Sequence, residues 1–425
     1  MKLFGFFRRS SSAGAEGPVR ELAQLCDALL AESGEYASTA LAREAVARWH
    51  QLDEAAREEF FDVLATEYSP PEAQLQAAAA AYQAEPSSDN LIQLQQASES
   101  PRRELFDRLN MTPGGTAALV EMRRVLLAHV RSKPHWRLLD YDLRRRLRSW
   151  FNRGFLRLER IDWRTSALVL EKLIAYEAVH AVQGWPDLRR RLQADRRCYA
   201  FFHQQLPDDP LIFIEVALTH GMSARVQPLL EVRAPIGDPM KADCAMFYSI
   251  TNCQEGLRGI SFGNQLIKQV AEDLKHEFPH LKRFATLSPI PGFRRWLENN
   301  AAPALLARIA DPAWHLGEIP EALQSALTGL CAYYLVRAKQ DGGEPLDPVA
   351  RFHLGNGASL DRLNFLGDTS DSGMARSAGL MVNYVYSLAE LEKNHERYFR
   401  ERAVSASSAV DRLARECALP GQDAA

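Results

Sequence analysis

Ser288 places a hydroxyl group in a stretch of chain with very little conformational freedom. It lies in the segment 286–293, TLSPIPGF, and the apolar run 281–285 before it is expected to form a short strand. Each proline fixes its own φ, removes a backbone N–H and pushes the preceding residue toward extended geometry. A side chain held at a strand end suits a functional site, whereas the alternative is a rigid turn in which Ser288 caps the next helix. No G-x-S-x-G motif surrounds Ser288, so a serine hydrolase is not indicated.

His353 is the second side chain suited to proton chemistry. It stands in the segment 352–358, FHLGNGA, between apolar residues. Such a histidine is usually structural, but it would act as a general acid or base if the fold brought it to Ser288. Tyr384 and Tyr386 fall on one face of an expected strand, where most tyrosines are core residues with a polar tip.

Three glycines lie between an expected strand at 244–250 and an expected helix at 264–277: Gly256, Gly259 and Gly263. Glycines let the backbone approach a ligand closely, and the free N–H groups of a helix start attract phosphate oxygens. A pyrophosphate group is therefore a suitable ligand, and a tight turn is the alternative. The spacing matches neither G-x-G-x-x-G nor a Walker A loop.

His220 and Gly221 follow the strongly apolar run 211–218, which is expected to be a buried strand. A strand end with a glycine can present backbone N–H donors to a ligand. A plain turn is the alternative at this position.

The elements that must position these residues form two different parts of the chain. In the first part, amphipathic helices are expected from residue 19 and at 36–52, 54–68, 72–83, 90–111 and 116–130. From about residue 154, strands at 155–161, 211–218 and 244–250 alternate with helices at 166–180, 187–202, 264–277, 321–339 and 387–417. The predicted fold is α+β with two domains: a disordered tail at 1–17, an all-α helical bundle at 18–155 and a mixed α/β domain at 156–425.

Composition excludes several classes of protein. The chain has 425 residues, 46% of them hydrophobic and 25% charged, as in ordinary globular proteins. A net charge of −3 gives no general attraction to nucleic acid or to a membrane, and no apolar run is long enough to span a bilayer. Six scattered cysteines without a C-x-x-C pair indicate neither zinc nor disulfides, so reduced thiols in the cytoplasm are expected. The arginine-rich run 144–148, with Arg153, Arg157 and Arg160 beyond it, is expected to be a solvated helix face or a subunit contact. The alternative is that it holds the phosphates of nucleic acid or of a nucleotide cofactor.

Together, these segments resemble the malonyl-CoA decarboxylase family. The serine segment 287–293, the histidine segment 352–358, the segment 215–222 and the closing segment 381–386 match the motifs of that family. They occur in the order of the family and cover roughly residues 163–388.

The resemblance implies a helical domain for oligomer assembly, with a homo-oligomer and in particular a tetramer expected. It implies a second domain with a fold similar to GNAT acyltransferases. The expected CoA-binding residues are Arg258, Gly259, Ile260, Ser261, Phe262, Gly263 and Asn264 around the pyrophosphate, together with His220 and Gly221. Some relatives carry an acidic residue where Ser261 stands.

The implied reaction converts malonyl-CoA to acetyl-CoA and CO2 through an enolate. Neither a metal nor biotin is needed if hydrogen-bond donors stabilise the enolate oxygen, since one such donor contributes about 3–4 kcal/mol. Ser288 is expected to orient the carboxylate, and His353, with a pKa near neutrality, to protonate the enolate. Tyr386 and Asn356 are expected to fix His353 or the carbonyl group. The alternatives are a GNAT-type acyltransferase, which transfers an acyl group from CoA, and a CoA-binding scaffold without turnover.

Overall fold

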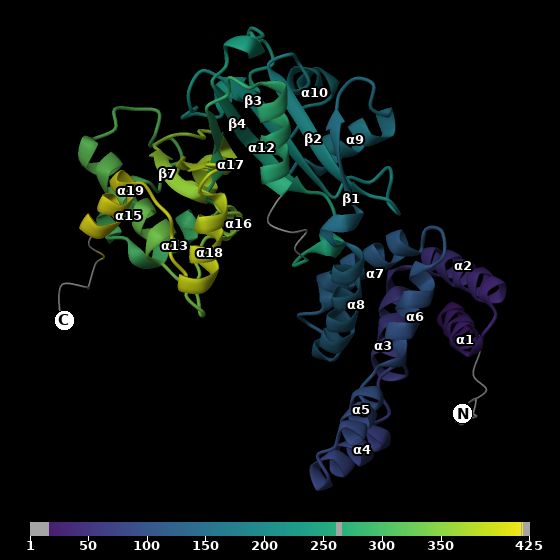
Figure 1. Cartoon of the computed structure of the whole chain (residues 1–425). Coiled ribbons are helices and arrows are strands. Elements are labelled where there is room, and N and C mark those ends of the chain that lie inside the picture. Colours follow the sequence, from purple (N-terminus) through teal and green to yellow (C-terminus); the bar gives the residue numbers. More distant parts are fainter. Residues whose placement is uncertain (1–16, 261–265, 418, 420–425) are drawn as a thin grey trace. The chain divides into compact units, whose positions relative to one another are not determined.

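The computed structural model describes residues 17–260, 266–417 and 419. The chain divides into a helical unit, Met1–Asn152 with Gln254–Ile260, and a sheet unit, Arg153–Cys253 with Ser261–Ala425. Residues 1–16 of the expected tail lie outside the described residues. The predicted class is confirmed, because helices come first and a mixed sheet with helices follows (Figure 1).

The helical unit is built around aromatic and aliphatic side chains such as Trp49, Phe61 and Trp136, which are fully buried. Its helices are α1 Pro18–Ala31, α2 Glu35–Gln51, α3 Glu54–Thr66, α4 Glu72–Ala84, α5 Ser88–Ala97, α6 Pro101–Asn110, α7 Gly115–His129 and α8 Arg137–Trp150. The prediction of one helix at 90–111 is wrong, since the chain leaves the helix after Ala97 and restarts at Pro101. Proline suits the first turn of a helix and not its interior.

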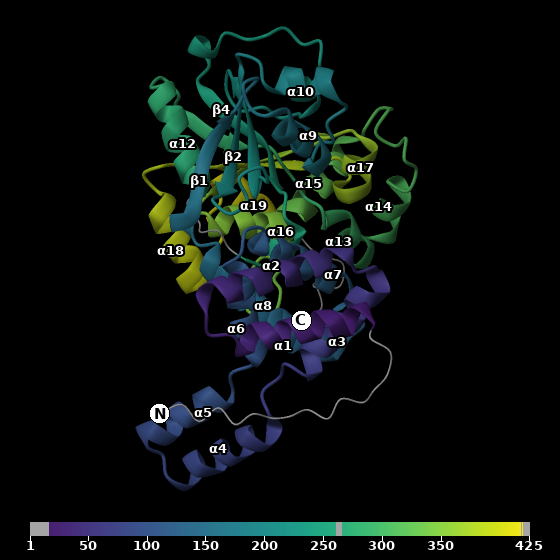
Figure 2. The ribbon, with the colours of Figure 1, turned by 90° about the vertical axis from the view of Figure 1, so that its right-hand side faces the viewer.

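The hairpin α4–α5 differs from the rest of the helical unit. Neither helix has a buried residue, and the pair extends away from α1, α2 and α3 (Figure 2). Leu91 and Ile92 of α5 are among its exposed apolar side chains.

The sheet unit is organised by one twisted sheet with the strand order β1-β2-β3-β4-β5-β8-β6, with β7 paired to β8. The strands are β1 Leu156–Ile161, β2 Arg196–His203, β3 Ile212–Thr219, β4 Cys244–Asn252, β5 Arg283–Thr286, β6 Ser288–Pro289, β7 Ser359–Asn364 and β8 Met381–Val385. The pairing of β4 with β5 is parallel, and all the other pairings are antiparallel.

The helix expected at 187–202 is only partly correct. Helix α10, Trp185–Arg191, ends early, and β2 begins at Arg196. All eight residues of β2 are buried, because β1 and β3 flank it and both faces of the sheet are covered. Tertiary pairing has overridden a local helical pattern at this strand.

Helices cover both faces of the sheet. Helix α12, Leu266–Glu277, lies on one face, while α9, Ala167–Tyr176, and α10 lie on the other (Figures 1 and 2). Leu170, Leu173 and Leu188 of α9 and α10 pack on Ala200 and Phe202 of β2. This packing makes the sheet a rigid support for residues at its strand ends.

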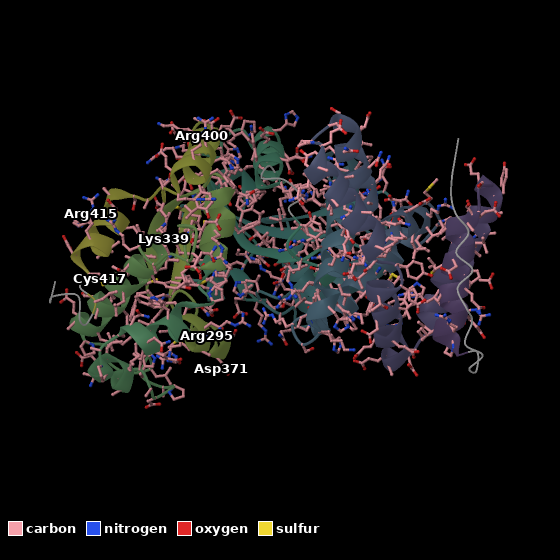
Figure 3. All side chains as sticks on the ribbon, turned by 90° about the horizontal axis from the view of Figure 1, so that it is seen from below. Arg295, Lys339, Asp371, Arg400, Arg415 and Cys417 are labelled. Atoms are coloured by element: carbon pink, nitrogen blue, oxygen red, sulfur yellow. The ribbon has the colours of Figure 1, made fainter. Side chains whose placement is uncertain are left out.

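The remaining helices of the sheet unit gather beside β6, β7 and β8. They are α11 Gln227–Leu230, α13 Phe293–Asn300, α14 Pro303–Arg308, α15 Glu321–Val336, α16 Pro348–Gly355, α17 Asp371–Ser377, α18 Leu391–Glu401 and α19 Ser408–Glu416. The long helix expected at 387–417 is wrong, because Arg402 adopts a φ of 53° between α18 and α19. Charged side chains such as Arg400 and Arg415 project from these helices (Figure 3). In the described part of the chain, no helix has the length and apolar character needed to cross a membrane.

Candidate active site

Ser288 is held by the sheet and does not cap a helix. It forms β6 with Pro289 and pairs with Val382 of β8, directly after β5 and Leu287. Helix α13 begins later, at Phe293, and its N-cap residue is Gly292. The helix-cap interpretation of Ser288 is therefore wrong. The side chain is buried, and its hydroxyl donates to Thr286 Oγ1 at 2.8 Å.

His353 lies in the last turn of α16 and is likewise buried. The helix starts at Pro348 behind an aspartate N-cap, Asp347, whose carboxylate accepts from the Ala350 N–H at 2.8 Å. The ring of Tyr384 stacks on the imidazole with 4.5 Å between the ring centroids. The imidazole is thus held between an aromatic face and the serine segment.

Ser288 and His353 meet, and they belong to a directed chain of hydrogen bonds. Ser288 Oγ lies 2.9 Å from His353 Nε2, and Tyr386 Oη lies 2.7 Å from His353 Nδ1. Because the Ser288 hydroxyl donates to Thr286, its oxygen is free to accept from an Nε2–H group. This assigns the proton of the neutral ring to Nε2 and makes Tyr386 the donor to Nδ1.

Burial sets the charge of the imidazole. Desolvation lowers the pKa of His353 to about 3, so the ring is neutral when the cavity holds no anion. The expectation of a pKa near neutrality thus differs from the structure, because the sequence does not reveal that the ring is buried. Burial also raises the pKa of Tyr386 well above its usual range, which keeps the phenol protonated.

A cavity of about 220 Å³ opens against this pair. Ser288 and His353 form its polar wall, together with Ser249 and Asn252 of β4. The other lining residues are Tyr248 and a set of apolar residues: Val179, Phe247, Ile250, Leu287, Pro289, Pro348, Val349 and Phe352. The cavity therefore offers a hydroxyl and an imidazole to a small polar group in surroundings that hydrate it poorly.

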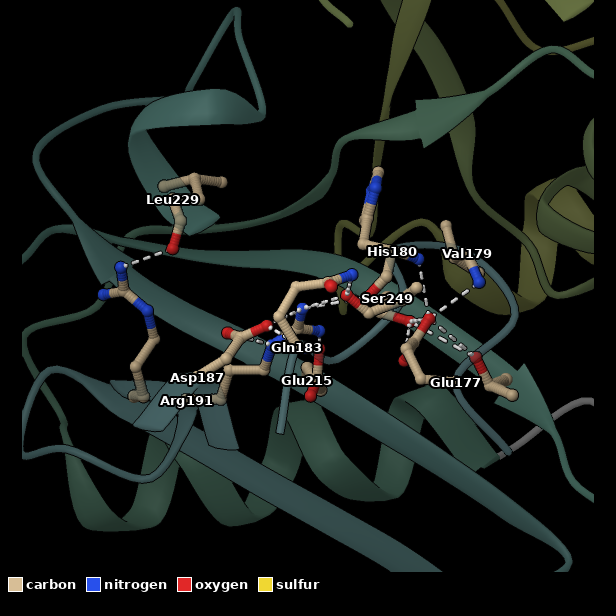
Figure 4. A network of polar contacts seen from close by, with 12 residues as sticks. Glu177, Val179, His180, Gln183, Asp187, Arg191, Glu215, Leu229 and Ser249 are labelled. Atoms are coloured by element: carbon tan, nitrogen blue, oxygen red, sulfur yellow. Dashed lines mark hydrogen bonds and ion pairs between the residues drawn. The ribbon is translucent and has the colours of Figure 1, made fainter. Parts of the chain in front are cut away.

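A buried polar network behind the cavity was not predicted from the sequence (Figure 4). Glu177 accepts from Ser249 Oγ at 2.8 Å and from the backbone N–H of Val179 at 2.7 Å. Arg191 donates to Glu215 Oε2 at 2.8 Å, yet burial raises the pKa of Glu215 to about 8. The network fixes the chain at Val179 against β4 and so shapes one wall of the cavity.

The expected CoA loop is described only at its beginning. Arg258, Gly259 and Ile260 belong to the helical unit, where Arg123 of α7 donates to the carbonyl of Arg258 at 2.9 Å. Gly256 is required here, since a Cβ atom would lie 2.0 Å from the carbonyl oxygen of Val120. The predicted contacts at Ser261, Phe262, Gly263 and Asn264 lie outside the described residues.

Arg123 anchors this segment through its guanidinium group. It is buried, it is paired with Asp140 at 2.9 Å, and it also donates to the carbonyl of Gly256 at 2.7 Å. Nothing in the sequence singles out Arg123 as such an anchor, because many other arginines lie near it in the chain.

The other predicted binding residues lie away from the cavity. Gly221 has a φ of 66°, and its N–H donates to Asp243 at 2.6 Å, next to the first residue of β4. His220 and Gly221 therefore form a turn at one end of β4, whereas the cavity lies along residues 247–252 toward its other end. The Asn356 side chain donates to the Phe352 carbonyl at 2.7 Å and so supports the end of α16.

The six cysteines are free, and all except Cys417 are buried. Among the residues that the structure describes, no group of three or more histidine, cysteine or acidic side chains is arranged to hold a metal ion.

Comparisons with known proteins agree over most of the chain. Residues 154–423 match the family model of the malonyl-CoA decarboxylase C-terminal domain, and residues 68–151 match that of the N-terminal domain. The mitochondrial malonyl-CoA decarboxylase of Anser anser anser is 38% identical over 348 residues, which is 73% of this chain and 69% of that protein.

Two solved structures are similar along nearly the whole chain. The crystal structure of malonyl-CoA decarboxylase from Rhodopseudomonas palustris has 47% sequence identity and a TM-score of 0.89. That from Agrobacterium vitis has 44% identity and a TM-score of 0.85, and both matches cover 93% of this chain and 99% of the other. The chain therefore belongs to the malonyl-CoA decarboxylase family of carbon–carbon lyases.

Proposed function

We propose that the protein converts malonyl-CoA to acetyl-CoA and CO2 without a metal or biotin, with Ser288 orienting the carboxylate and His353 protonating the enolate. The observation that supports this most is the 2.9 Å contact between Ser288 Oγ and His353 Nε2 at the wall of a small apolar cavity. Such a site offers a neutral hydroxyl group and a proton carrier side by side.

The low pKa of His353 fits this reaction once the charge of the substrate is included. A malonyl carboxylate beside Nε2 is an opposite charge for an imidazolium, so its arrival favours uptake of a proton from solvent. Loss of CO2 removes that carboxylate and leaves electron density on the enolate. The buried imidazolium then donates its proton to the α carbon and returns to the neutral form that burial favours.

The apolar walls also promote the loss of CO2. A carboxylate in water is stabilised by its hydration shell, and Phe247, Val349 and Phe352 can supply little of that stabilisation. The product CO2 is uncharged, so moving the reacting group into this cavity favours cleavage. Ser288 then restrains the carboxylate, so that the breaking bond lies roughly perpendicular to the thioester plane.

Incubation of the protein with malonyl-CoA tests the proposal directly. We expect CO2 and acetyl-CoA in equal amounts, with no change after treatment with EDTA or avidin. Release of CoA that depends on an added amine, without CO2, would instead support the acyltransferase alternative. Binding of CoA without any product would support the scaffold alternative.

The variant Ser288→Ala distinguishes an orienting role of Ser288 from nucleophilic attack by its hydroxyl group. The expected result is a fall in kcat, with no acyl-enzyme in the mass spectrum of either the parent protein or the variant. An acyl group trapped on Ser288 in the parent protein would contradict the orienting role. The Nε2 proton argues against attack, since a ring that already donates to Ser288 is not a base toward it.

The oligomeric state is a second part of the proposal. We infer a homo-oligomer assembled through the helical unit, supported by the α4–α5 hairpin, in which no residue is buried. Short helices of this kind are marginally stable without packing partners. Light scattering after size-exclusion chromatography should give a mass of several chains, whereas a single-chain mass would contradict this inference.

A further inference from the structure

The carboxylate of Asp347 lies where the serine and histidine segments come together. It is completely buried between α15 and the start of α16. Its Oδ1 accepts from the Ala350 N–H at 2.8 Å, its Oδ2 would lie 4.0 Å from a Cβ atom placed on Gly292, and the backbone N–H of Gly292 lowers the pKa of the carboxyl group. One side chain thus touches the first turn of the helix that carries His353 and the end of the loop that carries Ser288.

We infer that Asp347 is a positioning residue that sets the separation of Ser288 and His353 by holding both of their segments on one carboxylate. The inference rests on the proposed function, in which these two side chains act together. It assigns a role in the reaction to a residue that touches neither the cavity nor the reacting groups.

The two chain segments that connect the Asp347 carboxylate to Ser288 and to His353 are both stiff. The serine loop, residues 288–292, contains two prolines, which leave it few conformations. On the other side, His353 follows Asp347 within six residues of helix, and successive helical residues are fixed relative to one another. A shift of the carboxylate contact therefore changes the 2.9 Å distance between Ser288 Oγ and His353 Nε2 instead of being absorbed on the way.

Helix α15 also packs against the contact between Asp347 and Gly292. Tyr334 Oη lies 3.5 Å from Asp347 Oδ2, and a Cβ atom on Gly292 would lie only 2.4 Å from Tyr334 Oη. The backbone angles of Gly292 suit any residue, with φ −97° and ψ −9°, so close packing alone requires the glycine. The loop end is therefore pressed against Tyr334 and Asp347 together.

The charge of Asp347 gives the contact a pH dependence. Burial raises the pKa of Asp347 to about 6, although the N–H groups of Ala350, Val349 and Gly292 oppose this shift. The charged or titratable groups that influence it are Arg351 of α16, Tyr334 and Cys331 of α15, and Tyr384 of β8. Above pH 6 the carboxylate attracts both backbone segments, and below it the protonated group holds them less firmly.

Asp347→Ser tests the inference, because serine still caps α16 but has no second oxygen for the loop. We expect kcat for CO2 release to fall about 10- to 100-fold, the loss typical of a displaced reacting group, with KM changed less than about threefold. The acid limb of kcat near pH 6 should also disappear. The matched control is Asp53→Ser, which replaces the aspartate cap of α3 and should leave kcat unchanged.

A kcat within about twofold of the parent, or an unchanged acid limb, would overturn the inference. Gly292→Ala provides an independent test if Asp347→Ser fails to fold. The added methyl group should lower kcat by forcing the loop from Tyr334, and Tyr334→Phe in the same chain should restore it by removing the crowded oxygen. Failure of this rescue also contradicts the inference.

These outcomes are separable from those of the proposed function. If the parent protein releases CO2 and Asp347→Ser does so equally fast, only the positioning role fails. If the parent protein releases no CO2, the proposed function fails. The role of Asp347 is then read from the ¹⁵N chemical shifts of His353, which should change in Asp347→Ser and stay constant in Asp53→Ser.

Discussion

Ser288 Oγ and His353 Nε2 lie 2.9 Å apart although 65 residues separate them in the sequence. The contact joins a two-residue strand, β6, to the last turn of α16. Its direction is set by neighbours on each side, because Thr286 accepts the serine proton and Tyr386 supplies a proton to Nδ1. The pair therefore has one preferred protonation pattern in the free protein.

Thr286→Val should reduce turnover without removing Ser288. Valine has the same shape but cannot accept the Ser288 proton, which is then free to turn toward His353. The buried N–H of Tyr384 also loses its acceptor, so we expect a lower kcat and a loss of about 1–3 kcal/mol in the free energy of unfolding. Kinetics and urea unfolding measure both effects.

The matched control for this substitution is Thr112→Val. Thr112 is buried, and its hydroxyl has no hydrogen-bond partner among the described residues. Its replacement should leave kcat unchanged, and an equal loss of kcat in both variants would contradict the specific role of Thr286.

Tyr386→Phe should release the His353 ring from its preferred tautomer. The phenol at 2.7 Å is the donor to Nδ1, so without it the ring can carry its proton on either nitrogen. We expect a fall in kcat of about 10-fold, which is less than the ~10²- to 10⁴-fold loss of a general acid because His353 itself remains. The ¹⁵N chemical shifts of the ring should show the mixture of tautomers directly.

Tyr398→Phe serves as the control, since the buried Tyr398 hydroxyl has no hydrogen-bond partner among the described residues. It should have parental kinetics. Unchanged ¹⁵N shifts in Tyr386→Phe would show that Tyr386 does not select the tautomer.

His353 should make the folded protein less stable in acid. Its pKa falls from an ordinary value near 6.5 to about 3 on folding, so the unfolded chain binds more protons between these values. The stability contributed by the neutral ring is present above pH 6.5 and is lost as the pH falls toward 3, by ~1.4 kcal/mol per pH unit. Urea unfolding of the parent protein and of His353→Asn from pH 4 to 7 isolates this contribution. Parallel curves for the two proteins would contradict it.

Arg123→Gln should weaken substrate binding more than it slows the reaction. The guanidinium holds the carbonyl groups of Gly256 and Arg258, which lead into the expected pyrophosphate loop. We expect KM for malonyl-CoA to rise about 10-fold, equivalent to ~1.4 kcal/mol of binding, with kcat nearly unchanged. Arg124→Gln is the control, because the hydrogen bonds and the ion pair of that exposed neighbour in the described structure go to Glu121 of the same helix and not to the carbonyl groups of Gly256 and Arg258. Equal KM values for the two variants would exclude an anchoring role.

Much of the local architecture could be predicted because local patterns determine it. The prolines around Ser288 indicated an extended, stiff segment, and β6 is such a segment. The apolar run 211–218 indicated a buried strand, which is β3. Where local preference competes with distant pairing the prediction was wrong, as at β2, whose residues are in a strand because β1 and β3 flank them.

The partners of the site residues could not be predicted from spacing. Thr286 and Ser288 stand two residues apart, which places them on one face of an extended chain, but their hydrogen bond depends on the turn between β5 and β6. Asp347 before Pro348 shows the pattern of a helix start, and nothing in it indicates the contact with Gly292. Burial of His353, which lowers its pKa, arises from helices and strands brought together by the fold.

The most direct test of the account measures CO2 release by His353→Asn alongside its affinity for acetyl-CoA. Asparagine retains a polar side chain but cannot carry the proton that the enolate needs. We expect kcat to fall by about 10²- to 10⁴-fold, the range of a lost general acid, while the Kd for acetyl-CoA stays within about threefold of the parent value. A kcat close to that of the parent protein would contradict the assignment of His353 as the proton donor.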